Sequence, residues 1–149
     1  MEDNMKNTMA ITALITLVTV SLPTLVWGAD SMSDAEQAKR QAAVVPALQE
    51  AAASATGYQR ASIEVKSTAY QITIAIVNGK LNDGSTTERT AEASKIATAC
   101  AKVITGRPDF AAVLIIHVDY VKRVGNKSTV VAGVDFNKAP DGSFTLHLT

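Results

Sequence analysis

The chain has 149 residues, of which 47% are hydrophobic, and its 14 basic and 14 acidic side chains give a formal net charge of zero. A balanced charge argues against nucleic acid as a partner, because that binding depends on lysine and arginine side chains that neutralise phosphates. It argues equally against an anionic membrane surface. The length suits a single domain with one core.

The first 28 residues have the pattern of an export signal. A short start containing Lys6 precedes the apolar run at 9–22, and small or β-branched residues flank the expected cut after Gly28. We therefore expect an exported protein, periplasmic or secreted, that has no membrane segment after the signal peptide is removed. Cleavage removes one basic and two acidic residues, so the mature chain stays close to neutral. An uncleaved anchor is the alternative, because ~20 apolar residues span a bilayer and the stretch at 9–27 nearly reaches that length.

Residues 29–58 are rich in alanine and predict a helical arm. Ser33 and Glu36 have the spacing of a capping box, Pro46 predicts a break or kink, and Gly57 predicts the end of the helix. The apolar stripe of this helix consists mostly of alanines, which bury little surface. Two alternatives stay open: the arm packs on the following domain or on a partner, or it is loosely packed.

The segment at 62–77 alternates between apolar and polar residues, which is typical of a β-strand. Ile63 and Val65 occupy odd-numbered positions, whereas the apolar residues of 70–76 occupy even-numbered positions. In one continuous strand the two sets would point to opposite sides. A single strand with a bulge near Ser67 would reconcile the two halves, and so would two separate strands.

Residues 85–105 predict an amphipathic helix with clear boundaries. Ser85 and Glu88 make a second capping box, and Gly106 ends the helix. Its apolar stripe comprises Ala93, Ile96, Ala97, Cys100, Val103 and Ile104. Cys100 is the only cysteine of the chain. Because it lies in the middle of this stripe, we expect it to be buried and inert rather than joined to another molecule.

Three more strands are predicted in the C-terminal part of the chain. Alternation from 110 to 124 predicts a long strand, and a two-residue hairpin turn at 125–126 leads into a returning strand at 130–137. A further turn at 140–142 precedes a short last strand at 144–149.

The order of elements is thus α-β-α-β-β with a short final strand, which predicts an α+β fold. We expect a two-layer sandwich, with a mainly antiparallel sheet of three to four strands and helix 85–105 over its more apolar face. The domain organisation is then a signal peptide at 1–28, an Ala-rich helical arm at 29–58 and an α+β domain at 59–149. Such a fold alone assigns no activity.

The face that helix 85–105 is expected to leave uncovered carries the best candidates for a site. His117 and Asp119 point to the same side of one strand, Asp135 lies on the neighbouring strand, and His147 lies on the next. Two imidazoles and two carboxylates suit zinc or a similar divalent ion if they converge. The signal is weak, because neither a His-x-x-x-His spacing nor a Glu beside a ligand His is present. An ordinary polar role, in which His117 holds Asp119, is the simpler interpretation.

The same face is also too apolar to be only solvated. Its expected interaction residues are Val113, Ile115, His117, Asp119 and Val131. The helical arm, a second copy of the chain or a partner protein would cover it. No nucleophile elbow, phosphate loop or cofactor motif is found. We therefore predict an exported, non-enzymatic interaction domain without a cofactor, which binds a protein partner or forms a homodimer. The alternative is a small metal-dependent or acid–base hydrolase using His117 and Asp119.

Overall fold

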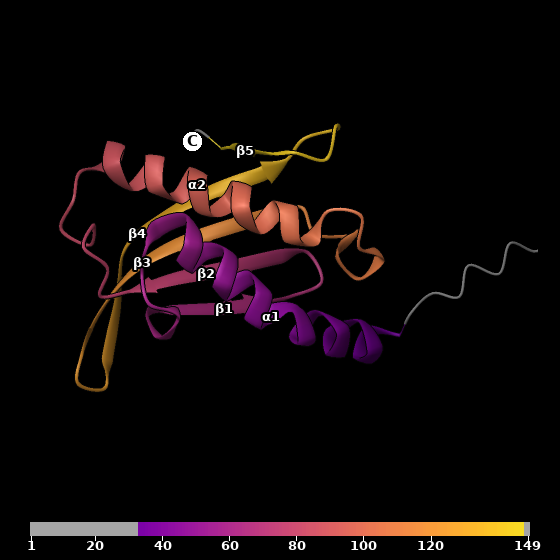
Figure 1. Ribbon diagram of the computed structural model, residues 1–149, viewed down its shortest axis with the longest axis horizontal. Coiled ribbons are helices and arrows are strands. Elements are labelled where there is room, and N and C mark those ends of the chain that lie inside the picture. The colour runs from indigo at the N-terminus through magenta and orange to yellow at the C-terminus, as the bar shows by residue number, and fades with distance from the viewer. Residues whose placement is uncertain (1–32, 148–149) are drawn as a thin grey trace, which may run out of the picture. The chain divides into compact units, whose positions relative to one another are not determined.

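The structure, a computed structural model, describes residues 33–147. The expected signal peptide and its cleavage site lie outside the described residues. Within them the chain forms two helices and five strands, so the predicted α+β class is confirmed (Figure 1). None of the helices in this part of the chain is long and apolar enough to cross a membrane.

All five strands belong to one sheet, in the spatial order β1-β2-β3-β4-β5. The strands are β1 (Ile63–Ser67), β2 (Gln71–Val77), β3 (Ile115–Val124), β4 (Lys127–Lys138) and β5 (Phe144–Leu146). Strands β2 and β3 are parallel, and the other three pairings are antiparallel. The sheet is therefore mixed and larger than the expected three to four mainly antiparallel strands.

Two local features account for the difference. Residues 62–77 form two strands rather than one bulged strand, because Thr68 and Gln71 close a turn with a 2.8 Å backbone hydrogen bond from Thr68 N to Gln71 O. Helix α2 (Thr86–Ile104) then connects β2 to β3. A helical crossover returns the chain to the same end of the sheet, so the two strands it joins run parallel.

Helix α1 (Asp34–Thr56) contains the Ala-rich segment and packs on the sheet. Its buried apolar side chains are Val44, Leu48 and Ala52, which belong to the same core as the strands. Pro46 lies inside the helix but does not end it. An interior proline costs about 3 kcal/mol, and because Pro46 is exposed while the buried stripe continues on both sides of it, packing offsets that cost.

Helix α2 begins with the predicted capping box. The Ser85 hydroxyl accepts a hydrogen bond from Glu88 N at 3.2 Å, and the Glu88 carboxylate accepts one from Ser85 N at 2.9 Å. Cys100 is fully buried in the stripe that faces the sheet, as expected. Burial raises the pKa of its thiol to about 12, so the thiolate, which is the reactive form, is not populated near neutral pH.

Both helices lie over the same side of the sheet, which we call the covered face (Figure 1). Its fully or almost fully buried side chains are Ile63, Ile72, Ile74, Ile76, Ile116, Val118, Tyr120 and Phe136. We call the opposite side the open face, because no element of residues 33–147 lies over it. His117 and Asp119 lie on this open face, as the alternation in the sequence predicted.

The strand predicted from residue 110 begins later than expected, at Ile115. Pro108 opens a short 3-10 turn, and Val113 N donates to Phe110 O at 3.1 Å, so the chain coils here instead of alternating. As a result Val113 is fully buried in the core and does not contribute to the open face. The prediction that Val113 lies on the uncovered face was therefore wrong.

A register shift in the β3–β4 pairing changes a second expected residue. Tyr120 pairs with Ala132, but the next residue, Val121, pairs with Val130, so Val131 is the extra residue of a bulge. Because of this extra residue, the β4 side chains that precede the bulge point to the opposite side from the one that simple alternation predicts. Val130 rather than Val131 therefore lies opposite Val121 on the open face. Both β4 valines remain exposed.

Candidate functional site

Strand register brings three of the four candidate polar residues together on the open face. His117 on β3 pairs directly with Asp135 on β4, and Asp119 lies two residues further along β3. His117 Nδ1 lies 2.6 Å from Asp135 Oδ1, and His117 Nε2 lies 2.8 Å from Asp119 Oδ1. The imidazole therefore bridges two carboxylates, one on each strand.

This arrangement favours the protonated imidazole. An ionised carboxylate can only accept hydrogen bonds, so both ring nitrogens of His117 must donate, which requires the imidazolium form. Burial by itself lowers the pKa of His117, but hydrogen bonds to Asp135 and Asp119, and the charges of both, outweigh it. The net pKa of His117 is raised above its ordinary value.

Gly133 provides the space that the imidazole occupies. It lies opposite Asp119 in the register. A Cβ atom at this position would lie 2.9 Å from His117 Cε1, 3.2 Å from His117 Nε2 and 3.3 Å from Asp119 Oδ1. The ring thus passes over the bare backbone of β4, and any larger residue at Gly133 would displace it.

A second ion pair crosses the open face beside this cluster. Arg123 on β3 donates to both carboxylate oxygens of Glu64 on β1, at 2.7 and 3.1 Å, so the pair reaches over β2. Hydrogen bonding from Arg123 lowers the pKa of Glu64. Both side chains are exposed, and exposed pairs contribute little to stability. Their effect is to order the surface between the outer strand and the hairpin.

His147 does not join the cluster. Its backbone N donates to Asp135 O at 2.9 Å, which extends the β4–β5 pairing, but Asn137 Nδ2 donates to its Nδ1 at 3.0 Å. Among residues 33–147 no group of three or more His, Cys, Asp or Glu side chains is arranged to hold a metal ion. The predicted set of His117, Asp119, Asp135 and His147 therefore does not converge as one ligand group.

Apolar side chains flank the charged cluster on the open face. Ile115 lies toward one end of β3, and Val121 faces Val130 toward the other end. Val130 is 56% exposed, and a shallow hollow of about 260 Å³ lies between it, Asp119 and Arg123. The face thus combines apolar contact area with a hollow and fixed charges.

The charges on this face balance when His117 is protonated. Its positive groups are Lys66, Arg123 and His117, and its negative groups are Glu64, Asp119 and Asp135. Loss of the His117 proton leaves one net negative charge on the face. Its electrostatic character therefore depends on pH over the range in which His117 titrates.

Several of these residues were missed in the sequence. Gly133 lies alone inside the strand between Ala132 and Val134, and an isolated glycine in a strand often marks a close approach, so this signal was available. The partnership of Glu64 and Arg123 had no signal, because the two residues are 59 positions apart and depend on the parallel pairing. Val130 could not be chosen over Val131 without the bulge.

The fold and this face define a two-layer α+β protein in which one side of the sheet is covered and the other is open. No family model matches the chain, and no curated protein or solved structure matches it either. Fold alone assigns no activity, so the function is argued from the open face itself.

Proposed function

We propose that this chain is an exported, non-enzymatic interaction domain that self-associates through the open face of its sheet. The export part of the proposal comes from the signal pattern at 1–28. The interaction part is supported by one observation above all: the open face holds Ile115 and Val130 around an internally neutralised charge cluster, with no described element over it.

Self-association is favoured over an arbitrary partner by the charge balance of the face. Two copies that meet through the same surface bring identical charges together, so a surface with a large net charge would repel its copy. The open face is neutral when His117 is protonated, and apolar residues lie on both sides of its charged centre. Such a surface can meet its own copy with apolar contacts and without net repulsion.

The hydrolase alternative has less support. A general base needs a free nitrogen lone pair within reach of a substrate proton, and both nitrogens of His117 are within hydrogen-bond distance of carboxylates. If His117 loses its proton, one ring nitrogen has a lone pair that could accept a substrate proton, so the hydrolase alternative is open to test. It predicts stoichiometric divalent metal after purification without chelator, and loss of that metal in His117→Ala. A preparation without bound metal would contradict the metal-dependent form.

The test of self-association is the native mass of the purified protein, measured by light scattering after size exclusion over a range of concentrations. We expect a dimer for the wild type, and a shift toward monomer by at least tenfold in dissociation constant for Ile115→Asp and Val130→Asp. Val124→Asp is the matched control, because Val124 is a more exposed valine of the same hairpin, 72% against 56% for Val130, and its side chain points to the opposite side of the sheet. A wild type that stays monomeric at every concentration would contradict the proposal.

The export part has a separate readout. We expect the mature protein recovered outside the cytoplasm to begin at Ala29, which intact-mass spectrometry measures directly. A recovered chain that retains residues 1–28 would support the uncleaved anchor instead. Because this result does not depend on the native mass, failure of one part is distinguishable from failure of the other.

A further inference from the structure

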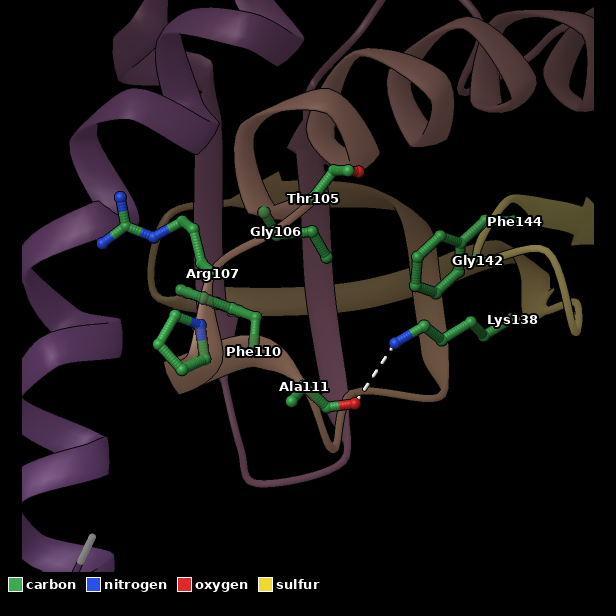
Figure 2. A pocket seen from close by; sticks show the side chains of 10 residues that line it. Thr105, Gly106, Arg107, Phe110, Ala111, Lys138, Gly142 and Phe144 are labelled. Atoms are coloured by element: carbon green, nitrogen blue, oxygen red, sulfur yellow. Dashed lines mark hydrogen bonds between the residues drawn. The ribbon is translucent and has the colours of Figure 1, made fainter.

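A second hollow lies on the covered side of the sheet, beyond the C-terminal end of α2 (Figure 2). Its volume is about 550 Å³, which is within the range of small-molecule sites, roughly 300–1,000 Å³. Two segments that are distant in the sequence line it: the stretch 104–111, which runs from the end of α2 through the 3-10 turn at Pro108–Phe110, and the hairpin between β4 and β5. The charged cluster of the open face, which consists of His117, Asp119 and Asp135, does not line it.

The walls of this cavity are mainly apolar. Ile104 and Phe110 line it and are almost fully buried. Phe144 lies across from Phe110 on the β5 side (Figure 2). Pro108 and Ala111 complete the apolar lining. A pocket lined by two aromatic rings and an isoleucine suits a flat or extended hydrocarbon group.

Among the residues that line the cavity, Lys138 has a charged group that is available to a ligand. Lys138 Nζ donates to Ala111 O at 3.2 Å, as Figure 2 shows. Among residues 33–147 Lys138 takes part in no ion pair with a carboxylate. An ammonium group has three N–H donors, so two of them stay available for an acceptor that enters the cavity.

The other charges near the cavity are already engaged. Arg107 pairs with Asp109 at 3.3 Å and stacks on the ring of Phe110, with its guanidinium directed away from Lys138 (Figure 2). The C-terminal end of α2 contributes only about half a negative charge. The full charge of Lys138 exceeds this partial charge, so the cavity favours a single anionic group over a cation.

We propose that this cavity binds an apolar molecule that carries one carboxylate, of the fatty-acid kind. The carboxylate accepts from Lys138 Nζ, and the hydrocarbon chain lies between Phe110 and Phe144. The site is separate from the open face, so it requires neither self-association nor any role of His117.

The probe for this site is decanoate, titrated into the purified full-length mature protein by calorimetry at concentrations where decanoate is monomeric. Decanol tests the charge, because it has the same chain without a carboxylate, and decyltrimethylammonium tests its sign. We expect decanoate to bind at least tenfold more tightly than decanol, and the cation not to bind. Equal affinity for decanoate and decyltrimethylammonium, or no binding of decanoate at millimolar concentration, would overturn the proposal.

Two variants locate the binding. Lys138→Gln keeps a donor for Ala111 O but removes the charge, so we expect it to reduce decanoate affinity to the level of decanol while decanol binding is unchanged. Ala111→Trp fills the cavity from an exposed position and should abolish the binding of both probes. Lys102→Gln, an exposed lysine of α2 outside the lining, is the matched control and should leave both affinities unchanged.

Thermal unfolding of each variant separates a lost site from a lost fold. If Lys138→Gln is folded and binds decanoate as tightly as the wild type does, the assignment of the carboxylate to Lys138 is wrong. If Ala111→Trp lowers the native mass of the protein instead of the decanoate affinity, the cavity holds a second copy of this chain and the ligand proposal fails.

Discussion

The two faces of the sheet are built from the same strands but obey different physical constraints. On the covered face, alternate residues of β2 and β3 are fully buried and almost all aliphatic, including Ile74 and Val118. On the open face, their neighbours in the chain include Thr73, Ala75, His117 and Asp119, together with the apolar Ile115 and Val121. Because side chains of a strand alternate in direction, one set of residues packs in the core and the other set faces away from it.

The largest expected effect compares apolar truncations on the two faces. Ile74→Ala removes a fully buried side chain from the covered face and should lower the free energy of unfolding by about 2–5 kcal/mol. Ile115→Ala on the open face should cost about 1 kcal/mol or less, because Ile115 is only half-buried. Urea unfolding measures both. Equal losses would show that something covers the open face in the folded monomer.

The next effect tests how closely the His117 ring approaches β4. Gly133→Ala places a methyl group 2.9 Å from His117 Cε1 and should destabilise the protein by about 1–3 kcal/mol, since overpacking displaces the ring from its carboxylates. The same change in a His117→Ala background should stabilise it by a few tenths of a kcal/mol to about 1 kcal/mol, because alanine loses less backbone freedom than glycine. The change of sign, measured in a double-mutant cycle by urea unfolding, distinguishes a steric contact from a general requirement for glycine.

These comparisons also show how much of the structure could be predicted from the sequence alone. The alternation of 115–121 correctly separated the covered from the open residues, and the capping box of α2 correctly placed the start of that helix. Both patterns are local. Val113 was assigned to the open face because a 3-10 turn can share the apolar pattern of a strand.

What the sequence could not supply was pairing between distant segments. His117 meets Asp135 only because β3 and β4 adopt one register, and the bulge at Val131 shifts that register for the rest of the hairpin. The parallel contact of β2 with β3 depends on how α2 crosses the sheet, which no local period encodes. The site residues were thus identifiable by type, whereas their contacts were decided by tertiary structure.

A third prediction concerns pH, which should act on the open face alone. The pKa of His117 is raised in the folded protein, so folding favours its protonated form. The resulting stabilisation is fully present below the ordinary histidine pKa of about 6.5 and is lost as pH rises through the higher folded-state pKa. Urea unfolding between pH 6 and pH 9 should show this decline in the wild type but not in His117→Gln. His147→Gln should retain the decline.

The pH dependence of the native mass extends the same test to self-association. Each copy gains one net negative charge on its open face when His117 loses its proton, so two copies repel each other. We expect the dimer to weaken as pH rises through the folded-state pKa of His117, and His117→Gln to abolish that dependence. A dimer that is equally stable from pH 6 to pH 9 would place the contact somewhere other than the open face.

The smallest effect on folding should come from the ion pair across β2. Arg123→Met removes both hydrogen bonds to Glu64, but the pair is exposed and screened by salt, so urea unfolding should barely change. Its effect on the dissociation constant of the dimer should be larger, because Arg123 lines the hollow beside Val130. Ile74→Ala on the covered face should do the reverse, with a large loss of stability and no direct effect on association among the molecules that remain folded. A variant that leaves the stability of the monomer unchanged while it weakens the dimer would support association through the open face rather than through the covered face.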